Sequence, residues 1–437
     1  MLRTNDNNCG INIEENLIPD LDIIANKKIS KLVSEGNHNL LIFPSDLDVN
    51  KDKIGESNIF DLDNNLLTTH NVMGFIGINN TEVTIQSRFA QNGKDYFLHY
   101  MLKKVFSINL VDLKYSFNNE NVFDFLLYIF PYYLKKALRQ GLYKEYHRKE
   151  YNNANVKGAI DINRQIKYNM PFLGNIAYRV KEYSYDNKIT QLIRHTIEFI
   201  KQRDLSQGIL YTDTETQNCV DLIKQATPTY TNNDRTKIIN ENLKPFSHPY
   251  FFEYNGLKKI CLQILRHEGL KFGEDKDKIY GLLFDGAWLW EEYLNTFLID
   301  LDFKHPQNKV SKGAFNLFKD RSGYKRYPDF IKDNFILDAK YKRLDHNGND
   351  WVNRDDMNQI ISYMYIKSAM IGGFICPNDD NFINTCRSRL GELNGYGGEV
   401  FIWRLRIPKG AESFTEFCEK MGSEEEKMKD KINEECL

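Results

Sequence analysis

Two aspartates and a lysine in the stretch that ends at Lys340 have a spacing that a β-hairpin would bring together. Asp333-Asn334 is a polar pair between two short apolar runs, a pattern typical of a hairpin with a two-residue turn. Pairing outward from this turn places Asp329 opposite Asp338, and Lys340 follows two residues further along the same face. Adjacent carboxylates repel each other unless a positive charge lies between them. The pattern therefore predicts a divalent metal ion beside the lysine.

These residue types suit the hydrolysis of a phosphodiester, which needs a metal-activated water and neutralisation of the phosphate charge. Mg²⁺ or Mn²⁺ prefers oxygen ligands and keeps several waters, so the two aspartates and one main-chain carbonyl, that of Ala339, would suffice. Lys340 would orient the water or help to deprotonate it. On its own, however, Asp338-Ala339-Lys340 is a pattern that occurs by chance in most proteins, so the flanking elements decide its meaning.

A helix is predicted before the hairpin, because residues 285–301 have apolar side chains at helical spacing. Glu291 and Glu292 are adjacent in it, and neighbours on a helix point about 100° apart, so only one of them can face a site. The common alternative for either glutamate is a charge on the surface.

A second helix is predicted after the hairpin, with Asp355 or Asp356 as its cap. It carries Gln359 and Tyr363 four residues apart, so both side chains lie on one face. The intervening residues 344–353 are polar and predict a loop.

The composition is that of an ordinary globular protein, with 41% hydrophobic and 27% charged residues and a formal net charge of −2 over 437 residues. This length allows about two to three domains. The seven cysteines are scattered without a Cys-x-x-Cys pair, which favours free thiols in a reducing cytoplasm over a zinc site. No signal peptide or long apolar run is present, and no G-x-x-x-x-G-K-[ST] loop, so we expect a cytoplasmic chain that alone binds no nucleotide.

We expect an α/β, multi-domain (α+β) chain whose N-terminal part is β-rich. Short alternating apolar runs predict strands at residues 40–43, 72–78 and 82–86. The predicted parts are a β-rich domain at 1–90, a mixed helical and strand partner-binding region at 91–248, a C-terminal domain around the hairpin at 249–410, and a charged tail at 411–437. From Ser413 onward we expect this tail to be a solvated or frayed helix.

The order helix with Glu, Pro-Asp, Asp-Ala-Lys and helix with Gln and Tyr resembles the αβββαβ core of PD-(D/E)xK nucleases. Other phrases of the chain resemble the McrC-type nuclease subunit of McrBC modification-dependent restriction systems, although Ala159 stands where a basic residue is expected. The phrases are Arg139-Gln140-Gly141-Leu142, Tyr146, Val156 to Asp161, Ser184 to Asn187, and Leu289 to Tyr293.

This resemblance implies a Mg²⁺-dependent endonuclease that cuts double-stranded, modified DNA and docks on an McrB-like AAA+ GTPase or ATPase ring. The implied catalytic residues are Asp329, Asp338, Lys340, Glu291, Gln359 and Tyr363, and the implied metal ligands are Asp329, Asp338, Ala339 and Glu291. Two alternatives stay open: a non-cleaving adaptor that activates an AAA+ ring with a degenerate nuclease fold, and a nuclease that acts without a partner.

Overall fold

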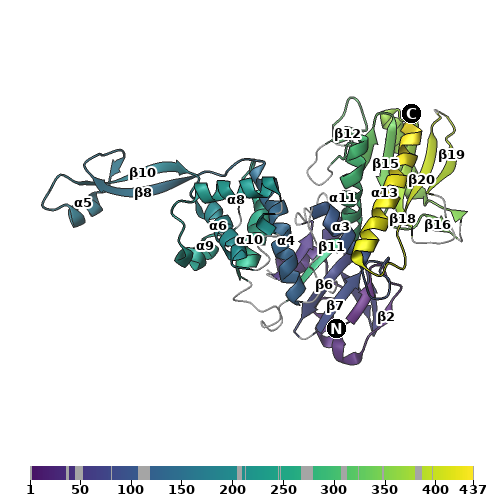
Figure 1. Cartoon of the computed structure of the whole chain (residues 1–437), viewed down its shortest axis with the longest axis horizontal. Coiled ribbons are helices and arrows are strands. Elements are labelled where there is room, and N and C mark those ends of the chain that lie inside the picture. Colours follow the sequence, from purple (N-terminus) through teal and green to yellow (C-terminus); the bar gives the residue numbers. More distant parts are fainter. Residues whose placement is uncertain are drawn as a thin grey trace. The chain divides into compact units, whose positions relative to one another are not determined.

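The structure is a computed structural model of the whole chain. It describes all residues except 1, 36–38, 45–52, 80, 107–118, 204–208, 212, 245, 247, 267–278, 307–312, 323, 347–348, 379–385, 396 and 437. The chain forms two compact units (Figure 1). Unit 1 consists of Met1–Val122 and Phe272–Leu437, and unit 2 consists of Phe123–Lys271. The predicted boundaries after residues 90 and 248 do not coincide with this division.

The N-terminal part of unit 1 is a sheet with the strand order β1-β7-β6-β11-β3. Its strands are β1 (Leu2–Asn5), β3 (Asn39–Phe43), β6 (Val72–Ile78), β7 (Thr81–Gln86) and β11 (Ile279–Asp285). Beside it lie β2 (Ile11–Asn12), β4 (Phe60–Asp63), β5 (Leu66–Thr69), α1 (Ile18–Asp22) and α2 (Ile29–Ser34). The β-rich character predicted for this segment is confirmed, and the three predicted runs lie within strands β3, β6 and β7.

Strand β11 explains why the two ends of the chain form one unit. It pairs antiparallel with β6 and parallel with β3, so that Leu282 lies opposite Phe75 and Leu41. The close approach needs a glycine at Gly74, where a Cβ would stand 2.0 Å from the carbonyl oxygen of Leu282 and φ is +129°. Because this strand from the C-terminal part is central to the N-terminal sheet, the two segments share one core.

The C-terminal part of unit 1 is a second sheet with the order β14-β15-β18-β20-β19. Its strands are β14 (Phe330–Lys332), β15 (Phe335–Ala339), β18 (Ile371–Asn378), β19 (Arg387–Glu392) and β20 (Glu399–Arg406). Strands β15, β18 and β20 run parallel, whereas β14 and β19 are antiparallel edges. Helices α11 (Gly286–Leu298) and α12 (Arg354–Lys367) belong to this part, together with the short pairs β12 (Phe315–Asn316) with β13 (Lys325–Arg326) and β16 (Asp345–His346) with β17 (Asn349–Asp350). The β16–β17 pair lies within residues 344–353, which were predicted to be a loop.

The C-terminal tail is helical, as predicted, but the expectation that this helix is solvated or frayed is wrong. Residues Phe414–Cys436 form one helix, α13, which contacts helix α3 (Tyr96–Phe106) and strand β20. Its buried side chains recur every three or four residues, so they form one apolar stripe: Phe414, Phe417, Met421, Met428 and Ile432. Glu425 is buried in the same stripe and accepts hydrogen bonds from Tyr100 and Tyr293.

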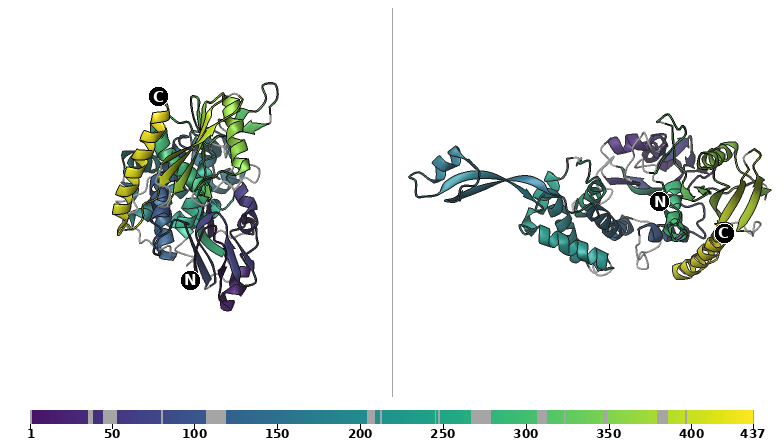
Figure 2. Two further views of the ribbon diagram at one scale, coloured as in Figure 1. Left: turned by 90° about the vertical axis from the view of Figure 1, so that its right-hand side faces the viewer. Right: turned by 90° about the horizontal axis from the view of Figure 1, so that it is seen from above.

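Unit 2 combines a helical body with a two-stranded arm. The body contains α4 (Asn119–Leu138), α6 (Lys188–Lys201), α8 (Thr214–Ala226), α9 (Arg235–Glu241) and α10 (Tyr254–Arg266). Helix α4 continues through Pro131 without being split. The arm pairs β8 (Glu145–Asn153) with β10 (Ile176–Ser184), and it carries β9 (Ala159–Ile160) and α5 (Ile162–Tyr168). Figures 1 and 2 show the arm reaching away from the helices of its own unit, with α5 at its far end.

None of the helices in the described ranges is long and apolar enough to cross a lipid bilayer.

Candidate functional site

The predicted hairpin is present with the predicted register. Phe330 pairs with Leu337, Ile331 with Ile336 and Lys332 with Phe335. The turn residue Asp333 has a φ of +46°, a conformation that Asp and Asn tolerate better than other side chains. The local sequence therefore fixes the turn, and the turn fixes which residues meet where the two strands end.

Asp329 and Asp338 lie beside each other at this end of the hairpin, as predicted. The main-chain N–H of Ala339 donates a hydrogen bond of 2.7 Å to Asp329 Oδ2. Asp338 is the last side chain but one of β15 and is 1% exposed. Strand β15 continues the parallel ladder with β18, because the N–H of Lys340 donates to the carbonyl of Ile375. The two carboxyl groups are therefore held in place by the β14–β15 hairpin and by the pairing of β15 with β18.

Burial is the largest influence on the pKa values of this pair. Burial raises the pKa of Asp329 well above its ordinary value, and the neighbouring Asp338 raises it further. Burial also raises the pKa of Asp338, although the adjacent Lys340 acts in the opposite direction. Two enclosed carboxyl groups in contact cannot both ionise without a positive charge between them. Lys340 supplies one positive charge beside Asp338, and a bound cation would favour ionisation of both groups.

Lys340 lies at the centre of the site. Its Nζ is 2.6 Å from Asp338 Oδ2, 3.2 Å from Asp356 Oδ1 and 3.1 Å from Gln359 Oε1. Burial opposes the charge on this lysine, but the surrounding carboxylates outweigh burial and raise its pKa above the ordinary value. Lys340 is therefore an ammonium ion at neutral pH.

Helix α12 supplies the other side of the site. Gln359 Nε2 donates to the hydroxyl oxygen of Tyr363 at 2.9 Å, so the two residues predicted to share a face do so. The predicted cap is wrong, because Asn353 caps the helix and accepts from the N–H of Asp356. Asp356 is thereby in the first turn, where its carboxylate reaches Lys340.

The close packing of α12 on the sheet depends on Gly372 in β18. A Cβ built at Gly372 would stand 2.3 Å from Met364 Sδ and 2.8 Å from Met364 Cγ. Both atoms belong to a side chain of α12 that is buried in the core between helix and sheet. Gly372 therefore sets the depth at which the helix presents Gln359 to Lys340.

Glu291 is contributed by α11 and approaches the hairpin through His305. The His305 Nε2 lies 3.6 Å from Glu291 Oε1 and 4.0 Å from Glu292 Oε1. The His305 Nδ1 lies 2.8 Å from the carbonyl oxygen of Asp329, which can only accept, so Nδ1 carries the proton. The structure thus brings both glutamates to His305 and does not by itself select Glu291.

Sequence reasoning missed three residues of this site: His305, Lys342 and Asp356. Lys342 Nζ lies 2.5 Å from Asp356 Oδ2. Asp356 therefore forms ion pairs with both Lys340 and Lys342, which follow the end of strand β15. The signal for Lys342 was its place two residues after Lys340, which puts both on one face of an extended chain. Asp356 had been considered only as a helix cap, and nothing in the sequence pointed to His305.

The residues present fit a hard divalent cation, with a small set of ligands. Across the described ranges, no group of three or more His, Cys, Asp or Glu side chains is arranged to hold a metal ion. The smaller set of two carboxylates and the carbonyl of Ala339 consists of oxygen atoms alone, which suits Mg²⁺ or Mn²⁺. Asp338 Oδ2 is buried and, apart from its ion pair with Lys340, has no hydrogen-bond partner among the described residues, so it has a lone pair to offer a cation.

The sequence matches the protein family described as "McrBC 5-methylcytosine restriction system component" over residues 67–377, which is more than half of the chain. A search of curated proteins finds no significant match.

Two solved structures from Thermococcus gammatolerans are similar to the chain. One is a refined half-complex from a tetradecameric assembly of McrB AAA+ hexamers with bound McrC, with 15% identity over 97% of this chain and 99% of that chain and a TM-score of 0.47. The other is the McrBC complex, with 16% identity over 70% of this chain and 89% of that chain and a TM-score of 0.32. Scores this low do not establish a shared fold, so the assignment to a family depends on the sequence match.

Proposed function

The chain belongs to the McrBC 5-methylcytosine restriction system component family, and from that premise we propose that it is the DNA-cleaving subunit of an McrBC-like restriction system. The observation that carries this proposal is the buried Asp338 beside the half-buried Asp329, with Lys340 next to both. Two adjacent carboxyl groups with a single lysine between them are only partly compensated, which destabilises a fold, so their presence favours a role in chemistry over a role in structure. The substrate that we propose is double-stranded DNA carrying a modified base.

The proposed core is of the PD-(D/E)xK type, and the metal is Mg²⁺ or Mn²⁺. Asp329, Asp338 and the carbonyl of Ala339 would hold it, with Glu291 as a further ligand through a water or directly. When bound, such an ion supplies an activated water and offsets charge on the scissile phosphate. Its charge would also offset the effects that raise the pKa of Asp329, which are burial first and then repulsion from Asp338.

The role that we propose for Lys340 is electrostatic. An ammonium ion whose pKa is raised keeps its proton at neutral pH, so it cannot accept a proton from water. It can donate hydrogen bonds to a phosphate oxygen or hold the attacking water in place. Gln359 fixes the direction of the ammonium group, and Tyr363 fixes Gln359.

We propose that the partner is an McrB-like AAA+ ring that hydrolyses GTP or ATP. In the Thermococcus gammatolerans half-complex, McrC is bound to McrB AAA+ hexamers. This chain has no G-x-x-x-x-G-K-[ST] loop of its own, which is consistent with a motor on another subunit. Exposed apolar side chains on the arm of unit 2 supply a surface for a protein partner, with Leu173 87% exposed and Ile162 and Met170 exposed nearby.

Reconstitution tests this proposal. The purified chain is mixed with an McrB-like AAA+ protein, duplex DNA containing 5-methylcytosine, nucleotide and Mg²⁺. We expect double-strand cleavage that stops when EDTA removes the metal, and little cleavage by the chain without the ring. Stimulated nucleotide hydrolysis without any cleavage would instead identify the chain as a non-cleaving adaptor, and rapid cleavage without the ring would identify a nuclease that needs no partner.

A further inference from the structure

A short β-ribbon directly before Asp329 carries an excess of positive charge. Strand β12 pairs with β13, and the N–H of Leu317 donates to the carbonyl of Tyr324 beyond the last pair. The charged residues of this ribbon, 315–326, are four cations and one carboxylate: Lys319, Asp320, Arg321, Lys325 and Arg326. Lys319, Arg321 and Lys325 are exposed. The ribbon therefore presents cations to solvent.

Within the part of the chain that the structure describes, no carboxylate forms an ion pair with any of the four ribbon cations. Other lysines of unit 1 do have such partners. On α13, for example, Lys427 Nζ lies 2.7 Å from Glu424 and Lys431 Nζ lies 2.7 Å from Glu434. The ribbon thus differs from an ordinary solvated face, in which opposite charges alternate.

A cavity beside the ribbon adds three further lysines. It has a volume of about 780 Å³, and its charged wall consists of Lys304, Lys332, Lys367, Asp302 and Asp333. The Lys367 Nζ lies 4.1 Å from the ring centroid of Phe315 in β12, which ties the cavity to the base of the ribbon. Counted together, ribbon and cavity contain seven cations and three carboxylates. Ribbon and cavity together therefore carry an excess of four positive charges.

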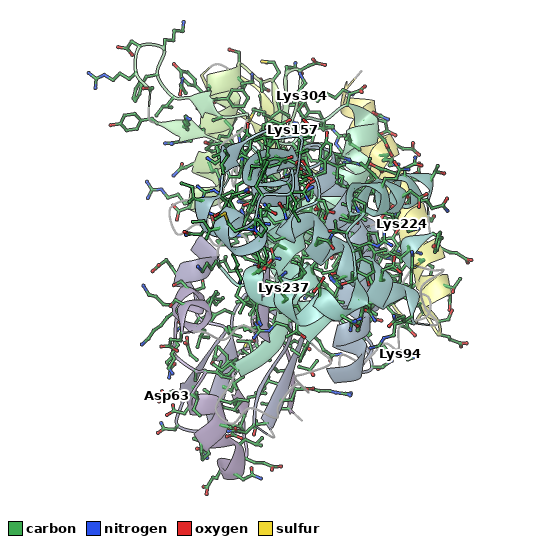
Figure 3. The ribbon with its side chains drawn as sticks, turned by 90° about the vertical axis from the view of Figure 1, so that its left-hand side faces the viewer. Asp63, Lys94, Lys157, Lys224, Lys237 and Lys304 are labelled. Atoms are coloured by element: carbon green, nitrogen blue, oxygen red, sulfur yellow. The ribbon has the colours of Figure 1, made fainter. Side chains whose placement is uncertain are left out.

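The ribbon and the cavity are adjacent to the candidate site. Arg326 precedes Asp329 by three residues, which is about 10 Å of extended chain. The cavity wall includes His305, whose Nδ1 donates to the carbonyl of Asp329. Figure 3 shows Lys304 towards the top of unit 1, and Figure 1 shows β12 at the same end. A polyanion on this surface would pass within reach of the two carboxyl groups.

We propose that the β12–β13 ribbon and the adjoining lysine-lined cavity bind the sugar-phosphate backbone of duplex DNA next to the site of cleavage. This inference deepens the proposed function and rests on it. A surface with uncompensated cations gains free energy by releasing counterions from DNA. A two-stranded ribbon also has a width that the major groove admits. At its tip the exposed rings of Phe318 and Tyr324, with centroids 5.3 Å apart, hold the two strands together.

The salt dependence of DNA binding tests this assignment. The full-length chain is titrated with a fluorescent duplex oligonucleotide containing 5-methylcytosine, in Ca²⁺ and at several KCl concentrations. The double variant R321Q/K325Q removes two ribbon cations. Because each phosphate contact contributes about 0.9 to the slope of log K against log salt, we expect the slope to fall by about 1.8. The matched control K427Q/K431Q changes net charge equally on α13, and we expect its slope to equal that of the wild type.

Equal slopes for the ribbon variant and the wild type would overturn the assignment, as would equal losses in both double variants, which would indicate bulk charge alone. Loss of binding to the AAA+ partner with unchanged DNA binding would also overturn it, since the ribbon would then contact an acidic protein surface. The proposed function can fail separately. If the wild-type complex does not cut DNA in Mg²⁺, the nuclease assignment is wrong. If the slope of log K against log salt still falls in the ribbon variant alone, the ribbon nevertheless binds DNA.

Discussion

Asp356→Asn tests the carboxylate of helix α12 that forms an ion pair with Lys340. The variant keeps the size and the hydrogen-bonding oxygen of the side chain and removes its charge. At an effective dielectric constant of about 20, unit charges separated by the observed 3.2 Å attract by about 5 kcal/mol, which is an upper bound. Lys340 keeps Asp338 and Gln359, and the side chains of Asp356 and Lys340 are 12% and 16% exposed, so screening by water reduces this value.

The net loss is better taken as the difference between a charged and a neutral hydrogen bond, about 1.4 kcal/mol. If Lys340 must be held in place in the transition state, this loss slows cleavage about tenfold. The assay is single-turnover cleavage of methylated duplex DNA by the reconstituted complex in Mg²⁺. Asp355→Asn is the matched control, because Asp355 is exposed in the same helical turn and loses the same charge near the helix N-terminus.

A stability measurement on the same variant gives the sign of the pH dependence. Burial acts to raise the pKa of Asp356, but Lys342 and Lys340 outweigh it and lower that pKa below 3.8. A carboxyl group with a lowered pKa in the folded state stabilises the fold above its ordinary pKa and loses this effect as the pH falls through the folded value. The stability difference between wild type and Asp356→Asn should therefore be present at neutral pH and shrink below pH 3.8. Cleavage at the wild-type rate, or an equal loss in Asp355→Asn, would refute the positioning role.

Three further predictions concern the site and its frame. Gly372→Ala should lower the free energy of unfolding by about 1–3 kcal/mol in chemical denaturation, because the new Cβ would meet Met364, and an unchanged midpoint would contradict the packing argument. Met421→Ala should cost about 2–5 kcal/mol in the same assay if α13 is part of the core, whereas a frayed helix would lose almost nothing. Lys340→Met should abolish cleavage without rescue at higher pH, since the lysine is proposed to act as a cation; activity that returns as the pH rises would favour a role as base.

The sequence was most informative where structure is local. The hairpin follows from Asp333-Asn334 and the alternation around it, so its register and the meeting of Asp329 with Asp338 were predictable. Strand β11 was not predicted, because its pairing partner β6 lies about 200 residues earlier and no local pattern specifies that contact. Its apolar run also continues directly into helix α11, which conceals the boundary.

Contacts between distant elements account for the remaining errors. The apolar stripe of α13 is divided among many Glu and Lys residues, so the sequence indicates a solvated helix, although Met421 is fully buried. Asp356 was considered only as a cap, because its pairing with Lys340 and Lys342 depends on how α12 lies on the sheet. That placement is set by side-chain packing at Gly372, which no local pattern reveals.

Cleavage by Asp338→Ala in the reconstituted complex tests the central claim most directly. This change removes the buried carboxylate at the centre of the site, 2.6 Å from Lys340, and leaves unit 2 untouched. We predict that Mg²⁺-dependent cleavage of methylated duplex DNA is lost while stimulation of nucleotide hydrolysis by the AAA+ partner is retained. A variant that still cuts DNA at the wild-type rate would contradict the assignment of the site.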